Sequence, residues 1–363
     1  MSDARRTMKS EYIEWAKTGA VARFNLASSG VLNYPIGELG VAIEDIELSG
    51  LSLYGYEPLQ RALAAKCEVE PENVVAAIGT SMANHLAMAA ILEPGDEALI
   101  ELPAYDPLLR VARYLGSTVK RFTRRFEDGF TIHPSEIERE VTSRTRLIVI
   151  ANLHNPTSAL TDNNTLEQIG EIARSIGARV LIDEVYLEAL FDRAPRSAFH
   201  LGPQFVTTSS LTKAYGLSGL RCGWVLAEPE LARRMWRLND LFGNIPAHPA
   251  ERLSVVALEK LDRIASRAQA LIEKNRVVLN RFLDSRDDLD VIRPGVGTTV
   301  APRLRVGKVG DLCSLLREKY ETVVVPGSFF EMPEHFRVGI GCDAAMLAEG
   351  LTRLAAALDE MKS

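Results

Sequence analysis

Short apolar runs alternate with longer amphipathic segments along most of the chain. The runs are rich in β-branched residues and alanine, and they lie at residues 74–78, 98–101, 147–151, 180–182 and 205–208. Most of them are separated by segments with apolar residues at helical spacing, such as residues 82–92 and 166–176. Strands buried on both faces have this composition. The pattern therefore predicts an α/β fold with a mainly parallel mixed sheet flanked by helices.

The pattern changes after Pro229 to long helical segments, which are interrupted at residues 244–246 and resume over residues 251–283. Strands are expected further on, at residues 298–306, 322–325 and 336–340. Helices are expected at residues 309–319 and 344–361. We therefore predict a large domain over residues 45–250. Residues 1–44 and 251–363 are predicted to form a smaller α+β domain, connected through the long helix.

Composition limits the classes of function. The chain has 363 residues, of which 47% are hydrophobic, so it is long enough for two cores. Its net charge of −6 comes without a basic block, which argues against nucleic acid or an anionic membrane surface as a partner. Residues 1–10 are polar, and no apolar run is long enough to span a bilayer. The 4 cysteines lie far apart, which predicts neither a metal site nor a disulfide framework and favours the reducing cytoplasm.

The most informative segment is residues 209–224, with the sequence SSLTKAYGLSGLRCGW. Lys213 lies just after a predicted buried strand. Burial and a nearby cation both lower the pKa of an amine, which leaves a lone pair that can attack an aldehyde. Arg221 and Ser210 are suited to hold a phosphate through charge-assisted and hydroxyl hydrogen bonds. The alternative is that Lys213 is a surface lysine in a glycine-rich loop.

This segment resembles the cofactor-lysine signature of the fold-type I pyridoxal phosphate enzymes, specifically the class I/II aminotransferases of the aspartate aminotransferase superfamily. The resemblance implies that pyridoxal 5′-phosphate forms a Schiff base with Lys213. It also implies that Ser210 and Arg221 contact the cofactor phosphate. The implied activity is transfer of an amino group between an amino acid and a 2-oxo acid, by a homodimer.

A second match is residues 181–186, LIDEVY. Asp183 follows an apolar strand, and open α/β sheets bind ligands at the carboxyl ends of their strands. The resemblance implies that Asp183 keeps the cofactor's ring nitrogen protonated, so that the ring withdraws electrons from a carbanion. Tyr186 is implied as the hydrogen-bond donor to the ring's phenolic oxygen. Taken alone, the two residues fit a helix N-cap and a core aromatic equally well.

A third match is the turn at residues 152–157, NLHNPT. The resemblance implies that Asn155 reaches the phenolic oxygen of the cofactor and helps to fix the substrate. His154 and Ser158 stand where many family members have asparagine and glycine, which puts the details of the substrate pocket in doubt. Asn-Pro by itself is common in structural turns.

A glycine turn opens the helix expected after residues 74–78. Gly79, Thr80 and Ser81 would present unpaired backbone N–H groups and the positive end of a helix dipole to an anion. The resemblance implies that this turn wraps the cofactor phosphate and that Tyr105 stacks on the pyridine ring. The plain alternatives are a tight turn and a packing aromatic.

Arg337 lies inside an apolar run of the smaller predicted domain. A buried arginine is costly unless it meets an anion, and a carboxylate matches its forked donors. The resemblance implies that Arg337 binds the substrate α-carboxylate; an internal salt bridge or a solvent-facing strand position is the alternative. No second arginine can be assigned to a side-chain carboxylate, so the amino donor stays open. The resemblance also implies a tyrosine that a neighbouring subunit contributes to the substrate site. Tyr34 and Tyr54 are the candidates for this residue.

Two other activities fit parts of this pattern. A Cα/Cβ lyase, such as a carbon–sulfur lyase, uses almost the same residues. An effector-sensing module without catalysis is less compatible, because it has no need of the full set of Lys213, Asp183 and Arg337. No metal is expected, since the histidines form no ligand spacing.

Overall fold

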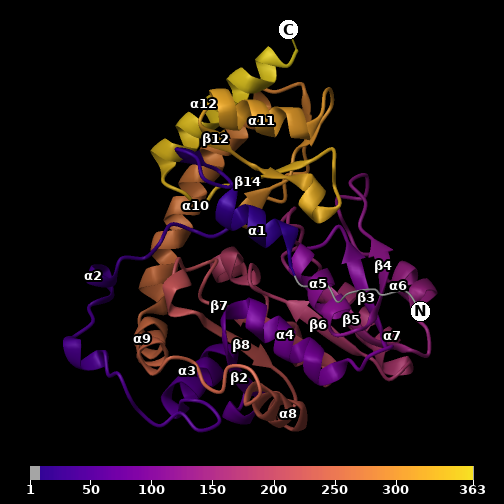
Figure 1. Cartoon of the computed structure of the whole chain (residues 1–363), viewed down its shortest axis with the longest axis vertical. Helices are drawn as coiled ribbons and strands as arrows, with labels where there is room; N and C mark the ends of the chain where they lie inside the picture. The colour runs from indigo at the N-terminus through magenta and orange to yellow at the C-terminus, as the bar shows by residue number, and fades with distance from the viewer. Residues whose placement is uncertain (1–8, 363) are drawn as a thin grey trace.

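A seven-stranded sheet forms the centre of the fold (Figure 1). The computed structural model describes residues 9–362. The strand order is β2-β8-β7-β6-β5-β3-β4, in which β8 runs antiparallel to both neighbours and the other paired strands run parallel. The strands are β2 (Val74–Ile78), β3 (Glu97–Leu102), β4 (Thr118–Thr123), β5 (Thr145–Ala151), β6 (Arg179–Asp183), β7 (Phe205–Ser210) and β8 (Cys222–Leu226). The predicted mainly parallel mixed sheet is therefore confirmed.

Helices cover both faces of this sheet. Successive strand residues point to opposite faces, so a continuous apolar run buries both. Ile100, Val149 and Leu181 belong to the core shared with α4 and α5, whereas Ile148 and Ile182 belong to the core shared with α6 and α7. The helices around the sheet are α3 (Glu57–Cys67), α4 (Gly79–Ile91), α5 (Asp106–Tyr114), α6 (Pro134–Glu140), α7 (Asn163–Ser175) and α8 (Pro229–Asn239).

A second apolar core lies in the C-terminal part of the chain, where Ile272, Leu312, Leu351 and Val338 pack together. Helix α10 leads from the sheet towards this part (Figure 1). The helices of this part are α10 (Leu261–Asp284), α11 (Val309–Lys319) and α12 (Ala344–Glu360), whereas the preceding helix α9 (His248–Glu259) packs in the core of the large sheet. The strands of this part are β9 (Leu289–Asp290), β10 (Thr299–Val300), β11 (Arg303–Leu304), β12 (Thr322–Val323), β13 (Val325–Pro326) and β14 (Phe336–Gly339).

The N-terminal segment joins this C-terminal part. Strand β1 (Phe24–Asn25) pairs in parallel with β12. It follows α1 (Glu11–Thr18), and α2 (Ile36–Leu39) comes after it. This pairing agrees with the expectation that N-terminal residues complete the smaller domain, but the domain boundaries themselves stay a prediction. Residues 1–8, part of the predicted small domain, lie outside the described residues.

Three predicted elements are each divided in the structure. The expected strand 298–306 is β10 and β11, which pair with β14 and β9 respectively, because Pro302 between them has no N–H to continue a ladder. The expected strand 322–325 is likewise divided into β12 and β13, which pair with β1 and β14. The expected helix 251–283 starts earlier and is interrupted at Lys260, whose backbone leaves the helical region.

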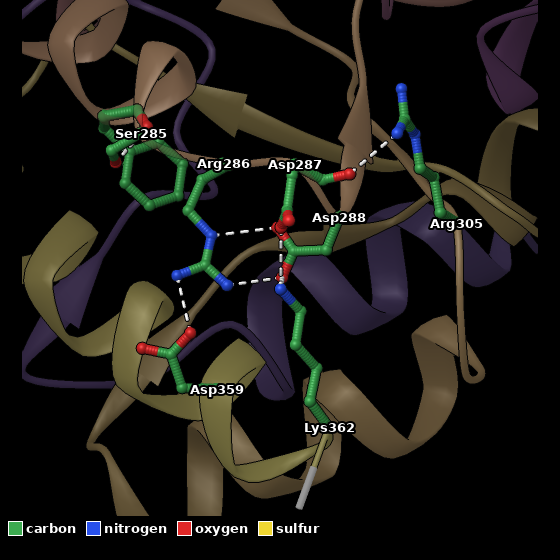
Figure 2. A network of polar contacts seen from close by, with 8 residues as sticks. Ser285, Arg286, Asp287, Asp288, Arg305, Asp359 and Lys362 are labelled. Atoms are coloured by element: carbon green, nitrogen blue, oxygen red, sulfur yellow. Dashed lines mark hydrogen bonds and ion pairs between the residues drawn. The ribbon is translucent and has the colours of Figure 1, made fainter.

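Figure 2 shows a polar network that joins the end of α10 to the end of α12. Arg286 donates through Nε to Asp288 Oδ1 at 2.9 Å and through Nη1 to Asp359 Oδ1 at 2.8 Å. Arg305 donates to the backbone carbonyl of Asp287 at 2.8 Å. Arg286 Nη2 also contacts Asp288 Oδ2, so this pair is bidentate and its geometry is fixed, and the contact with Asp359 joins α12 to it. Within residues 9–362, no helix is both long enough and apolar enough to cross a membrane.

Candidate active site

The carboxyl ends of β2, β5, β6 and β7 lie at one edge of the sheet and border a pocket. Its empty volume is about 680 Å³, part of which is open to solvent. That size is typical of sites for cofactors and small molecules. The predicted residues that line it are Thr80, Ser81, Tyr105, Asn155, Asp183, Tyr186, Ser210, Lys213 and Arg221. Gly79 and Arg337 adjoin it through contacts with Arg221 and Asn155.

Lys213 comes 3 residues after the end of β7 at Ser210, and its amine points to the N-terminal segment. Its Nζ donates to Ser29 Oγ at 3.1 Å. Burial lowers the pKa of the Lys213 amine, and the positive charges of Arg337 and Arg221 lower it further. The amine is therefore more easily present as the uncharged nucleophile than an exposed lysine would be.

Asp183 is the last residue of β6 and is buried beside the pocket. Its carboxylate accepts hydrogen bonds from Asn84 Nδ2 at 2.8 Å and from the Val185 backbone N–H at 3.1 Å. Burial raises the pKa of Asp183 to about 6, although the Asn84 hydrogen bond acts in the opposite direction. A cationic ring nitrogen in the pocket would be a natural partner for this carboxylate.

The start of α4 forms an anion cradle with Arg221. Gly79 has φ +74°, and a Cβ there would lie 2.2 Å from Arg221 Nη2, so the guanidinium packs directly on the glycine backbone. The hydroxyl oxygens of Thr80 and Thr212 are buried at the pocket, and no group in the described part of the chain is hydrogen-bonded to them. Ser210 Oγ accepts from the backbone N–H of Thr212 at 3.3 Å. Unpaired hydroxyls, a guanidinium and a helix N-terminus together fit a phosphate.

Arg337 lies in β14 and is almost fully buried, with an exposed fraction of 1%. It donates to Asn155 Oδ1 at 2.9 Å, to the Tyr12 hydroxyl at 3.0 Å and to the Ala27 carbonyl at 2.8 Å. Among residues 9–362 its Nε has no hydrogen-bond partner, and the three acceptors named here are all neutral. A buried cation that meets only neutral groups is suited to receive a carboxylate.

Tyr105 and Tyr186, two of the predicted site residues, border the pocket. The Tyr186 hydroxyl donates to Ser29 Oγ at 2.7 Å, so Ser29 contacts both Tyr186 and Lys213. Tyr105 is half-buried, and its ring meets the edge of the Tyr12 ring at a centroid distance of 5.6 Å. Burial raises the pKa of both Tyr105 and Tyr186, which keeps their hydroxyls protonated as donors.

Sequence reasoning missed Tyr12, Ser29 and Asn84, which also line the pocket. Only Asn84 left a signal, as a polar residue inside an otherwise apolar helical run. Tyr34 and Tyr54 lie outside the pocket of their own chain. The Tyr34 ring packs against Arg267, and Tyr54 is 52% exposed.

The two departures in the 152–158 turn have structural partners. His154 is buried, and its ring nitrogens lie 2.7 Å from Thr157 Oγ1 and 3.1 Å from the Pro103 carbonyl. Burial holds the pKa of His154 well below its ordinary value, so the ring is neutral. Ser158 Oγ donates to the Thr299 carbonyl at 2.9 Å. These contacts fasten the turn that carries Asn155.

The sequence profile described as aminotransferase class I and II matches residues 48–354, which is most of the chain. The chain belongs to the class I and II aminotransferases. The cofactor of this aminotransferase is pyridoxal 5′-phosphate, and its activity is transfer of an amino group between an amino acid and a 2-oxo acid. Three features of the pocket fit that cofactor. They are the buried hydroxyls of Thr80 and Thr212, the anion cradle at Gly79, and the lowered pKa of Lys213.

The chain is similar to individual proteins over most of its length. The aminotransferase is 31% identical over 346 residues to capreomycidine synthase of Streptomyces vinaceus, covering 92% of this chain and 89% of the relative. It is 27% identical to a probable aspartate/prephenate aminotransferase of Aquifex aeolicus, covering 85% and 82%. A solved PLP-dependent aminotransferase from Streptococcus suis superposes with a TM-score of 0.93 at 25% identity, covering 98% and 99%.

Proposed function

We propose that Lys213 is the residue that would hold pyridoxal 5′-phosphate covalently, and that its amine, once the substrate amine has displaced it from the cofactor, would move the proton at the substrate Cα. When bound, the cofactor withdraws electrons from that carbon. Asp183 would hold a proton at the ring nitrogen, and Tyr186 would donate to the phenolic oxygen. The observation that carries this proposal is the meeting of a pKa-lowered lysine and a buried carboxylate in a pocket with a phosphate cradle.

The phosphate and the substrate would be held at different sides of the pocket. Gly79, Thr80, Ser81, Ser210 and Arg221 would bind the phosphate through N–H, hydroxyl and guanidinium donors. On the other side, the α-carboxylate would replace the neutral acceptors that Arg337 now contacts, with Asn155 beside it. Fixing the carboxylate aligns the Cα–H bond for proton transfer. Tyr105 would supply an aromatic face for the ring.

The covalent assignment is tested by borohydride reduction of the holoenzyme followed by peptide mass spectrometry. We expect the reduced cofactor on the peptide that contains Lys213, and no adduct in Lys213→Ala. Lys274→Ala, an exposed lysine of α10, serves as the control and should keep the adduct. An adduct on another lysine, or full turnover by Lys213→Ala, would contradict the proposal.

The amino donor is identified by mixing the holoenzyme with each amino acid singly. A true donor changes the visible absorbance of the cofactor and releases the matching 2-oxo acid, which mass spectrometry detects. The cofactor is regenerated when a 2-oxo acid is added. An absorbance spectrum that no amino acid changes would contradict the proposed roles of Lys213 and Arg337.

The alternative activity is Cα/Cβ lyase chemistry on an amino acid, which would use the same lysine and the same buried carboxylate. The same lysine would then remove the Cα proton, but a substituent would leave from Cβ. Release of ammonia or pyruvate from an amino acid without any 2-oxo acid acceptor would identify this chemistry. Stoichiometric amino transfer to an added 2-oxo acid identifies transamination.

We further propose that the aminotransferase is a homodimer. Large apolar side chains are exposed on the segment of residues 43–54, where Ile43, Leu48, Leu51 and Leu53 are each about 80% exposed. Leu241, on another part of the chain, is similarly exposed. Contiguous exposed apolar surface is typical of protein–protein interfaces. A second copy of the chain would remove it from water.

The proposed location is the cytoplasm. Cys67, Cys222, Cys313 and Cys342 are all unbridged in the structure, as expected of proteins from a reducing compartment. Fractionation of cells with an antibody against the protein tests the location, and recovery in a secreted or membrane fraction would contradict it.

A further inference from the structure

Asn84 is a buried polar residue whose position calls for an explanation. It lies in α4, one turn after Thr80, and its exposed fraction is 4%. Its neighbours along the helix are mostly alanine, leucine and methionine. Asparagine is a weaker helix former than these residues, and burying its amide is costly unless both ends are hydrogen-bonded.

Both ends of the amide are bonded in the structure. The Thr208 hydroxyl donates to Asn84 Oδ1 at 2.6 Å, and Asn84 Nδ2 donates to Asp183 Oδ2 at 2.8 Å. Thr208 lies in β7 and is paired in register with Asp183 of β6. A helix and two neighbouring strands thus supply a chain of hydrogen bonds that ends on Asp183.

The direction of this chain is tied to the charge of Asp183. An ionised carboxylate only accepts hydrogen bonds, so Asn84 must turn its NH₂ group towards it. The carbonyl of Asn84 then faces Thr208, whose hydroxyl must donate. The opposite orientation would set two acceptors against each other, unless Asp183 were protonated.

Other groups also act on Asp183. The Val185 backbone N–H donates to its second oxygen at 3.1 Å, and Lys213 lowers its pKa by opposite charge. Glu101 and Glu184 act electrostatically in the opposite direction, because each is a buried acid that interacts with Asp183. Tyr105 and Tyr186 also interact with it as protonated hydroxyls. Among these neutral neighbours, Asn84 donates a side-chain hydrogen bond to Asp183. That bond offsets part of the rise in the pKa of Asp183 that burial causes.

We propose that Asn84, oriented by Thr208, is a positioning residue that keeps Asp183 ionised and aimed at the pyridine nitrogen of the cofactor. This inference rests on the proposed role of Asp183 above. Asn84 acts through Asp183, and Thr208 acts through Asn84. The three residues therefore set how completely the ring nitrogen stays protonated.

The test uses cofactor labelled with ¹⁵N at the ring nitrogen and bound to the full chain. The ¹⁵N chemical shift reports ring protonation directly, without turnover. We expect wild type to show the protonated position and Asn84→Leu to shift towards the unprotonated one. Apparent affinity of the apoenzyme for pyridoxal 5′-phosphate should fall about ten-fold, as expected for loss of a hydrogen bond to a charged group.

Thr208 variants separate positioning from general damage to the fold. Thr208→Val removes the hydroxyl at nearly constant volume and should move the ¹⁵N signal in the same direction as Asn84→Leu. Thr208→Ser keeps the hydroxyl and should restore the wild-type signal. In an Asn84→Leu background, Thr208→Val should add no further change, because its effect passes through Asn84.

The outcomes separate the two proposals. If wild type carries the cofactor on Lys213 with a protonated ring, and both Asn84→Leu and Thr208→Val keep that ¹⁵N position, the positioning role is wrong. If wild type does not carry the cofactor on Lys213, the proposed function fails first. Should Asn84→Leu not fold, Thr208→Val and Thr208→Ser alone decide, with the melting temperature of each recorded beside the spectrum.

Discussion

At the residue scale, Arg337 is the side chain that most narrowly limits which chemical group of a ligand can bind to it. Its planar fork is buried and meets neutral acceptors. We predict that Arg337→Lys raises the KM for the amino donor about 10- to 100-fold, because a lysine cannot make the paired hydrogen bonds that a carboxylate accepts from arginine. Steady-state kinetics with the donor found in the single-amino-acid screen measures this.

Tyr12→Phe is the matched control for that change. It removes the hydroxyl that accepts from Arg337 but keeps the ring against Tyr105 and Phe330. Its effect on KM should be smaller than that of Arg337→Lys. Equal KM values for wild type and Arg337→Lys would show that the carboxylate binds elsewhere.

The sequence predicted those site residues that lie at the ends of strands. Lys213, Asp183 and Asn155 each follow an apolar run, and parallel strands bring their carboxyl ends to one edge. Tyr12 and Ser29 could not be found in this way, since Tyr12 lies in helix α1 and Ser29 lies in the segment after β1, and neither follows a strand of the large sheet. Their positions depend on tertiary pairing that local sequence does not encode.

At the element scale, the turn from β2 into α4 combines backbone freedom with side-chain contact. We predict that Gly79→Ala weakens binding of pyridoxal 5′-phosphate about ten-fold or more, because the new methyl group displaces Arg221 and strains a residue at φ +74°. Titration of the apoenzyme with the cofactor measures the affinity. Gly95→Ala is the control, since Gly95 has φ +96° and no atom within 4 Å of the added Cβ.

Gly95→Ala should lose about 1 kcal/mol of stability through backbone strain and bind the cofactor as wild type does. If both alanine variants bind the cofactor equally well, contact between Gly79 and Arg221 is not needed for the phosphate site.

Element contacts also make stability depend on pH through His335. This buried imidazole precedes β14 and packs against Phe126 and Phe130, and neither ring nitrogen has a hydrogen-bond partner among residues 9–362. Burial lowers the pKa of His335 from 6.5 to about 4. The unfolded chain therefore binds more protons than the folded chain between these pH values, so His335 destabilises the fold as the pH drops from 6.5 towards 4.

We predict that His335→Leu removes this loss. Relative to the variant, wild type should become less stable by about 2 kcal/mol between pH 7 and pH 4.5. Urea unfolding of both proteins at the two pH values measures the difference. A constant difference across that range would show that the imidazole takes up its proton while still folded.

Several strands show why local sequence patterns are insufficient to predict every element of the fold. The edge strand β4 has the mixed sequence TVKRFT and escaped prediction because its Lys120 and Arg121 interrupt the apolar pattern. Strand β8 overlaps the segment of residues 209–224. That segment was interpreted as a cofactor site, so no strand was predicted there. The divided strands near Pro302 and Val324 are defined by their partners β1, β9 and β14, of which β1 lies almost 300 positions earlier in the chain.

At the scale of the whole molecule, the exposed segment of residues 43–54 is the feature that a single chain leaves unexplained. We predict that Leu48→Glu combined with Leu51→Glu converts the protein from dimer to monomer, because charges at the centre of an apolar interface are costly to desolvate. Light scattering coupled to size-exclusion chromatography measures the mass. Val306→Glu, which alters an exposed apolar residue in the C-terminal part, should stay dimeric.

A monomeric wild type would contradict this prediction, as would a double variant that stays dimeric at low micromolar concentration. Melting temperatures of the variants show whether the fold itself is retained.

The pairing of β1 with β12 has a practical consequence for anyone who handles this protein. Tyr12 precedes β1 and Ser29 follows it, and both residues line the pocket. A protease nick between Tyr12 and Ser29 would therefore separate two residues that line the same pocket as Lys213. Tags belong at the carboxyl end, beyond α12, which points away from the sheet (Figure 1).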